Sequence, residues 1–121
     1  HPEVPAIYRS VGQPVLIPGD MGAGSYVLVG TEQAMRESFG STCHGAGRLM
    51  SREAAIRSYS VKGIVQEMEA KGIYLRGSTK DGIQEEAPGA YKDIDDVIRV
   101  VVGAGLSRPV AKLTPIGVMK G

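Results

Sequence analysis

Apolar residues recur at the spacing of an amphipathic helix in two stretches of the chain. Behind Ser60 they lie at i, i+3, i+4 and i+7 over residues 61–71, and Gly72 follows as a stop signal. The same spacing begins behind Asp93 and ends near the glycines at 103 and 105. Each stretch therefore predicts a helix with an N-terminal cap and one apolar face turned towards the core.

Two shorter helices are predicted in the first half of the chain. Thr31 is a suitable N-cap for a helix that runs through Phe39, with Met35 and Phe39 on its apolar face. Ser51 is a suitable N-cap for another helix that runs to about Arg57.

Short apolar runs predict the strands. Residues 15–17 and 25–29 are closed by Pro-Gly and by glycine, as strands commonly are, and residues 73–76 form a third run. Residues 110–119 alternate loosely and are interrupted by Pro115, which is typical of an edge strand or a bulged strand. Because helices and strands mix without a regular βαβ rhythm or an internal repeat, we predict an α+β fold.

The remaining segments carry weaker signals. Residues 1–10 are marked by prolines and predict an extended segment, and residues 77–82 predict an exposed turn. Two carboxylates are adjacent at Glu85 and Glu86. Neighbouring residues of a strand face opposite sides, so we do not expect these two to work as a concerted acid–base pair.

Candidate chemistry gathers in residues 39–52. His44 directly precedes a Gly-Ala-Gly turn, and Arg48 and Arg52 follow at helical spacing. Glycines let backbone N–H groups approach an anion closely, and guanidiniums hold its oxygens while an imidazole nitrogen attacks phosphorus. The plainer alternative is that His44 is an ordinary turn residue and that both arginines are solvated.

Composition and charge limit the classes of function. The 121 residues carry a net charge of +1, so there is no global basic field of a dedicated nucleic-acid binder and any RNA contact must be local. The single cysteine, Cys43, allows no internal disulfide and suits a reducing compartment. No apolar run approaches membrane-spanning length and no leader pattern is visible, so we expect a cytoplasmic protein.

Four blocks of sequence, in order, resemble one protein family. They are Pro-Gly-Asp-Met-Gly at 18–22 with Ser-Tyr-Val-Leu at 25–28, His-Gly-Ala-Gly-Arg at 44–48, Glu-Glu-Ala-Pro at 85–88 with Tyr-Lys at 91–92, and Pro-Ile-Gly-Val-Met-Lys-Gly at 115–121. This pattern resembles the RtcB family of RNA-splicing ligases over the whole chain. It corresponds to about the last quarter of a family member, and the chain has no initiator methionine. The resemblance therefore implies that residues 1–121 are a C-terminal segment of an RtcB-like catalytic domain.

The resemblance also implies a reaction. Members of this family join RNA 2′,3′-cyclic phosphate or 3′-phosphate ends to 5′-hydroxyl ends in tRNA splicing and RNA repair, and they use GTP and divalent manganese. The matching histidine, His44, is expected to attack the α-phosphate of GTP and to carry GMP. The GMP then passes to the RNA 3′-phosphate, which the 5′-hydroxyl attacks. The expected partners are tRNA halves and the missing N-terminal part of the same protein.

Further residues match nucleotide contacts of the family. The backbone of Ala46 and Gly47 matches its ribose contact, and the side chains of Tyr91 and Lys120 match guanine contacts. Arg48 is expected to bind phosphate. Without the resemblance, Tyr91 would be interpreted as a half-buried phenol and Lys120 as a solvated terminus.

Two further positions stay open. Many relatives have serine at the position of Asp20, and that serine touches guanine. A carboxylate there could accept from guanine N1–H and N2–H₂ as a charge-assisted pair, or it could be a plain turn residue. Arg52 is either a phosphate contact or a solvated side chain.

The metal ligands of the family, an aspartate, a cysteine and histidines, lie upstream of anything in this chain. We therefore predict no metal ligand here and expect the chain alone to be inactive. The alternative to a ligase is a non-catalytic module that binds a nucleotide or phosphate and never forms a bond to His44. A purely structural fragment, ordered only when docked on the missing part, is a third possibility.

Overall fold

The computed structural model describes residues 2–121. His1, which belongs to the predicted extended segment, lies outside the described residues. Within them the elements follow in the order α1 (Ala6–Arg9), β1 (Pro14–Pro18), β2 (Ser25–Gly30), α2 (Glu32–Glu37), α3 (Arg52–Ser58), α4 (Val61–Ala70), β3 (Tyr74–Gly77), α5 (Lys80–Gln84), the 3-10 helix η1 (Pro88–Ala90), α6 (Ile94–Gly103), β4 (Ser107–Leu113) and β5 (Gly117–Lys120). Mixed helices and small sheets confirm the predicted α+β class.

All four predicted N-caps are confirmed by hydrogen bonds. The side-chain oxygens of Thr31, Ser51, Ser60 and Asp93 each accept from a backbone N–H in the first turn of the helix that follows. Such a bond satisfies one of the amides that a helix start leaves without an intrahelical partner. These caps fix where α2, α3, α4 and α6 begin.

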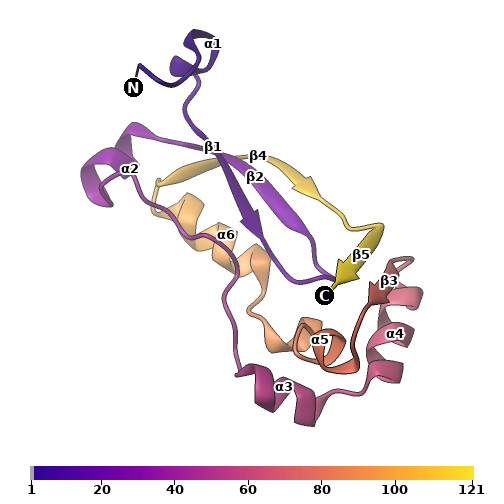
Figure 1. Cartoon of the computed structure of the whole chain (residues 1–121). Coiled ribbons are helices and arrows are strands. Elements are labelled where there is room, and N and C mark those ends of the chain that lie inside the picture. Colours follow the sequence, from indigo (N-terminus) through magenta and orange to yellow (C-terminus); the bar gives the residue numbers. More distant parts are fainter. Residues whose placement is uncertain (1) are drawn as a thin grey trace.

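Two small sheets form the framework (Figure 1). β1, β2 and β4 make an antiparallel sheet with β2 in the middle, and β3 pairs with β5 in parallel. The register between β2 and β4 shifts between Val27 and Leu28, so the prediction of a bulged edge strand is confirmed for β4. The shift falls next to Pro109, which cannot donate to a ladder.

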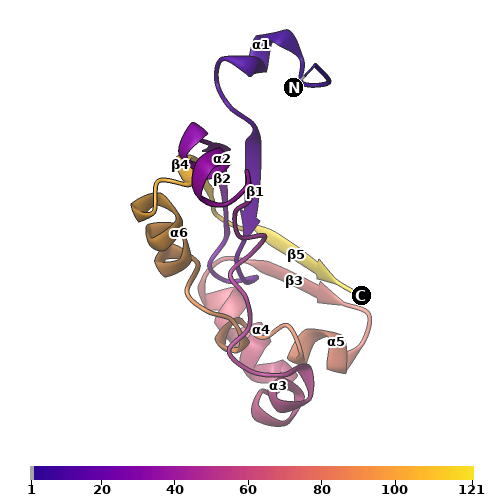
Figure 2. The ribbon, with the colours of Figure 1, turned by 90° about the vertical axis from the view of Figure 1, so that its left-hand side faces the viewer.

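Two apolar clusters hold the elements together. α6 lies along one face of the three-stranded sheet, where Ile94 and Ile98 pack with Ile17, Leu28 and Ala46 (Figures 1 and 2). A second cluster joins α4, β3 and α5, and its buried members are Met21, Ile64, Met68, Ile73, Ile83 and Ala87. The loop that carries His44 therefore enters the first core through Ala46, which is 5% exposed.

Several sequence predictions were wrong in detail. The first segment is not extended throughout, because Ala6–Arg9 forms α1 and the Arg9 guanidinium donates to the carbonyls of Val4 and Pro2. The helix expected to run through Phe39 ends at Glu37, and Phe39 adopts a φ of 55° and is 95% exposed.

The last part of the chain also differs from expectation. The predicted turn 77–82 contains the start of α5, which Thr79 caps, and Gly82 is buried. The long strand over 110–119 is two strands, because Pro115 separates β4 from β5. Glu85 and Glu86 follow α5 and do not lie in a strand, so the strand argument against their cooperation does not apply.

Candidate functional site

The loop that carries His44 connects α2 to α3 and is irregular. The N–H of Ala46 donates to the carbonyl oxygen of Pro18, at the end of β1, over 2.9 Å. His44 itself is exposed. Among the described residues, none forms a hydrogen bond or ion pair with its imidazole. The loop is thus anchored two residues after a histidine whose ring stays open to a ligand.

The other side of this loop is anchored to the segment before α6. Lys92 N–H donates to the Gly47 carbonyl over 3.0 Å, and Leu49 N–H donates to the Ala90 carbonyl over 2.8 Å, which forms an isolated antiparallel bridge. Gly47 has a φ of 78°, a conformation that favours glycine. Within residues 2–121 neither the Gly47 N–H nor the Ala46 carbonyl forms a hydrogen bond, so both are available to a ligand.

A cluster of charged and polar side chains centres on Glu86. Its Oε2 accepts from the Tyr91 hydroxyl over 2.9 Å and from the Lys120 ammonium over 3.1 Å. Its Oε1 accepts from Arg48 over 3.3 Å. We call Arg48, Glu86, Tyr91 and Lys120 the Glu86 cluster. The structure therefore brings together three of the residues predicted to bind nucleotide, around a carboxylate that sequence reasoning missed.

Arg48 is tied to protein acceptors on all three nitrogens. Nε donates to the Met50 carbonyl over 3.0 Å, one terminal nitrogen also donates to the Tyr91 hydroxyl over 2.9 Å, and the other donates to the Glu85 carbonyl. The guanidinium carbon lies 4.8 Å from the centre of the Tyr91 ring. Arg48 thus holds the cluster together, and its role as a phosphate ligand stays a prediction.

The charges of the cluster fix the protonation states of its members. Burial raises the pKa of the Glu86 carboxyl, but hydrogen bonds from Lys120 and Tyr91 and the charges of Lys120 and Arg48 outweigh burial, so that the pKa lies below its ordinary value of 4.5. Burial, the hydrogen bond to Glu86 and the charge of Glu86 together raise the pKa of Tyr91 above 10.0. At neutral pH Glu86 is therefore ionised and Tyr91 keeps its proton.

Asp20 shapes its own loop. Its Oδ1 accepts from the N–H groups of Gly22 and Ala23 over 2.7 and 2.9 Å. This oxygen therefore stabilises the turn, as the second of the two predicted alternatives for Asp20 expects. Asp20 and Lys120 line one cavity of about 290 Å³, which lies between the β1–β2 turn and the chain around Pro115. Oδ2 has no hydrogen bond to the described residues, so its contact with guanine stays a prediction.

Arg52 lies at the edge of this region. Its Nε is 3.8 Å from Oε2 of Glu85, and the Arg52 side chain is 68% exposed. Such a pair contributes little to stability because water screens it. Within the Glu86 cluster the two cations, Arg48 and Lys120, exceed the one carboxylate by a single charge. Asp20 lines the same cavity as Lys120 and offsets that charge, so the region as a whole has no excess charge.

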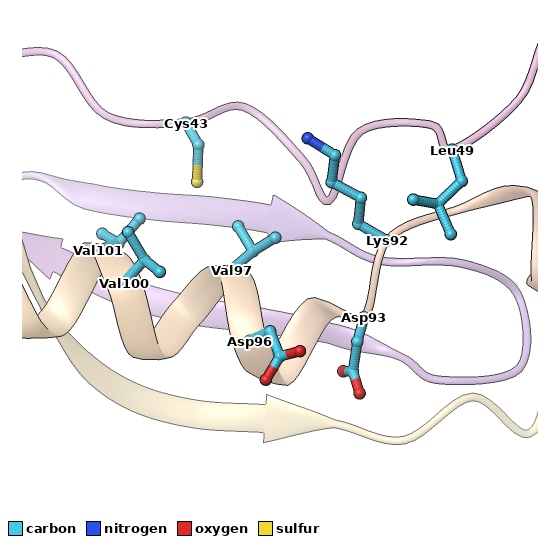
Figure 3. A pocket seen from close by; sticks show the side chains of 8 residues that line it. All are labelled: Cys43, Leu49, Lys92, Asp93, Asp96, Val97, Val100 and Val101. Carbon is cyan, nitrogen blue, oxygen red and sulfur yellow. The ribbon is translucent and has the colours of Figure 1, made fainter.

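A larger cavity, of about 610 Å³, lies beside the His44 loop and is shown in Figure 3. The Cys43 sulfur points towards α6, which contributes Val97, Val100 and Val101. The other lining residues are Leu49, Lys92, Asp93 and Asp96. Two carboxylates against one ammonium do not suit a triphosphate, and none of the residues predicted to bind nucleotide lines this cavity.

The part of the chain that the structure describes contains no group of three or more His, Cys, Asp or Glu side chains able to hold a metal ion. The donor set that manganese would need is therefore not found in residues 2–121. No helix in the same range has the length and apolar character to cross a membrane.

Sequence comparison identifies the relatives of this chain. The family model described as tRNA-splicing ligase RtcB matches residues 1–121. A protein named tRNA-splicing ligase RtcB from Archaeoglobus fulgidus is 60% identical over 98% of the chain and 25% of its own length. Its namesakes from Pyrococcus abyssi and Thermococcus kodakarensis are 59% and 56% identical over the whole chain and over 13% and 25% of their own lengths. The chain spans a quarter or less of these curated relatives, and it belongs to the RtcB tRNA-splicing ligase family.

Proposed function

We propose that the protein containing this chain is an RNA ligase that joins a 2′,3′-cyclic phosphate or 3′-phosphate end to a 5′-hydroxyl end, with tRNA halves as substrates. We further propose that it works through a covalent histidine–GMP intermediate on His44. The family match over the whole chain carries the first part. The second part is supported by an exposed imidazole on a loop that is anchored on both sides.

The proposed chemistry has three steps. An imidazole nitrogen of His44 bonds to the α-phosphorus of GTP while the bond to pyrophosphate breaks. An oxygen of the RNA 3′-phosphate then takes the GMP and restores the histidine, after water has opened the ring where the end is a cyclic phosphate. Finally the RNA 5′-hydroxyl loses its proton and attacks the activated 3′-phosphate, and GMP leaves. A neutral imidazole is a good nucleophile near neutral pH, and such a sequence divides one difficult step into easier ones.

The other residues are proposed to bind the nucleotide. The Ala46 carbonyl and the Gly47 N–H face the ribose, Tyr91 and Lys120 contact guanine, and Arg48 adds positive charge. Asp20 is proposed to accept from the base through the oxygen that its turn leaves open. Manganese is part of the proposal for the whole protein, but the described residues do not fit a metal site, so no step here depends on one.

A ligation assay tests the proposal. The protein that contains this chain is incubated with GTP, manganese and two RNA strands, one ending in a 3′-phosphate and one beginning with a 5′-hydroxyl. We expect a joined product from wild-type protein and none from His44→Ala, whereas Cys43→Ala, which changes only the neighbouring side chain, should still join the strands. GTP binding without any joined product would instead favour a non-catalytic nucleotide-binding module.

A further inference from the structure

We infer that Glu86 is a positioning residue that makes the site selective for guanine over adenine, by fixing which partner donates and which accepts a hydrogen bond at Tyr91 and Lys120. This inference rests on the proposed function and deepens it. It follows from counting which donors and acceptors of Tyr91 and Lys120 already form hydrogen bonds within the Glu86 cluster, and which remain for a ligand.

The Tyr91 hydroxyl has one proton and two lone pairs. The proton is given to Oε2 of Glu86 over 2.9 Å, and one lone pair accepts from Arg48 over 2.9 Å. One lone pair remains. Towards any further ligand, Tyr91 can therefore only accept a hydrogen bond.

Lys120 has the opposite character. An ammonium group has three donors and no acceptor, and one donor is used by the same oxygen of Glu86 over 3.1 Å. Because both side chains bond to one oxygen atom, they are held next to each other. The site thus presents a fixed acceptor beside a fixed donor.

Guanine carries the matching pattern on its edge. Its O6 accepts from Lys120, and its N1–H or N2–H₂ donates to Tyr91. Adenine has an amino group in place of O6 and a lone pair at N1, so donor would face donor and acceptor would face acceptor. A neutral phenol without a fixed partner could turn its proton either way and would accept both bases, so the selectivity depends on the carboxylate.

The ionised state of Glu86 and the protonated state of Tyr91 persist through neutral pH, because the pKa of Glu86 is lowered by its cations and that of Tyr91 is raised by burial and by Glu86. The hydrogen bonds of the cluster are also partly shielded from water. Side chains of Glu86, Arg48 and Lys120 are only 21%, 22% and 28% exposed, so water competes weakly for these bonds.

The test compares GTP with ATP in the whole protein. Glu86→Gln keeps the shape and removes the charge. Glu85→Gln is the matched control, because within residues 2–121 the neighbouring Glu85 carboxylate forms an ion pair with Arg52 alone, at 3.8 Å, and takes no part in the Glu86 cluster. We expect Glu86→Gln to reduce the ratio of covalent adduct formed from GTP to that formed from ATP by about tenfold, the size of one charge-assisted hydrogen bond. Glu85→Gln should leave the ratio unchanged.

Two further measurements keep the inference open to contradiction if Glu86→Gln folds poorly. Tyr91→Phe removes the hydroxyl and leaves both ion pairs of Glu86, and it should reduce the same ratio. Guanosine and adenosine nucleotide binding, measured by calorimetry in a His44→Ala background, gives a readout without any covalent step and should show the same loss of preference. If both variants weaken GTP and ATP equally, Glu86 is only structural and the inference is wrong. If wild-type protein binds no GTP at all, the proposed function fails first and the inference fails with it.

Discussion

The backbone N–H of Ala46 donates to the carbonyl oxygen of Pro18 over 2.9 Å. Pro18 ends β1 and leads into the turn of Asp20, whereas Ala46 comes two residues after His44. One hydrogen bond therefore couples the proposed nucleophile to the loop that holds a proposed base contact. A substitution that displaces one of these two loops should therefore also displace the other.

Two substitutions at Asp20 distinguish its role in the turn from the role of its negative charge. Asp20→Asn keeps an oxygen acceptor for the amides of Gly22 and Ala23, whereas Asp20→Ala leaves both amides without it. We expect Asp20→Ala to lower the free energy of unfolding by about 1–2 kcal/mol and to slow adduct formation. Asp20→Asn should keep the stability but narrow the preference for GTP over ATP, and Asp20→Ser should restore much of that preference.

Thermal melts and adduct rates with both nucleotides measure these effects. If the ratio of GTP to ATP is the same in wild type, Asp20→Ala and Asp20→Asn, the carboxylate shapes the loop and does not contact the base.

The placement of Lys120 depends on the buried glycine of α5. A Cβ at Gly82 would overlap the carbonyl oxygen of Gly121 and crowd Thr79. Gly82→Ala should therefore displace the end of β5, raise the KM for GTP and lower stability by about 1–3 kcal/mol. Gly103→Ala in α6 is the control, because a Cβ there meets no atom within 4 Å, and it should be neutral or stabilising by up to about 1 kcal/mol. An unchanged KM in Gly82→Ala would contradict this role of the glycine.

Two buried hydroxyls have no hydrogen-bond partner in the part of the chain that the structure describes, Oγ1 of Thr42 and Oγ of Ser107. Burying a hydroxyl without a hydrogen-bond partner destabilises the folded state, so removing the hydroxyl should raise the free energy of unfolding or leave it unchanged. We expect Ser107→Ala and Thr42→Val to leave the unfolding free energy unchanged or to raise it by about 1 kcal/mol in denaturant melts. A loss of comparable size would mean that an ordered water bonds to these hydroxyls.

An exposed network links α6 to the sheet through Asp95. Its carboxylate accepts from the Tyr26 hydroxyl and from Lys112, each over 2.8 Å. Hydrogen bonds from Lys112 and Tyr26 lower the pKa of Asp95 below its ordinary value of 3.8. Since the lowered pKa belongs to the folded state, the stabilisation is present above about pH 4 and is lost as the pH falls through the folded pKa.

Asp95→Asn should accordingly lower the melting temperature by a small amount at pH 7, and the difference from wild type should shrink towards pH 2. The effect should also shrink in high salt, because the network is exposed. A difference that grows in acid would contradict this assignment.

Local signals in the sequence were sufficient for most helices and for three strands. Capping side chains such as Ser60 and Asp93 act on amides a few residues away, so a single sequence reveals them. α5 was missed because its glycine argued for a turn, whereas Gly82 is needed there for close packing against Gly121. The pairing of β3 with β5 joins residues about forty positions apart and leaves no local signature.

The same distinction applies to the site. His44 was found from a compact motif, and its exposure agrees with a reactive role without testing that role. Glu86 was set aside because a strand was assumed, and only the fold shows that it meets Arg48, Tyr91 and Lys120 from three separate segments. In the sequence alone, nothing distinguishes Glu86 from a glutamate on the surface, although in the fold it lies between Arg48 and Lys120.

Mapping the nucleotide on the protein tests the central claim most directly. The protein that contains this chain is incubated with GTP and manganese, digested and examined by mass spectrometry. We predict a GMP increment on the peptide that contains His44, labile in acid and stable in base as a phosphoramidate is, and lost in His44→Ala but retained in Cys43→Ala. An increment located on another residue, or an adduct of undiminished intensity in His44→Ala, would contradict the assignment of His44 as the nucleophile.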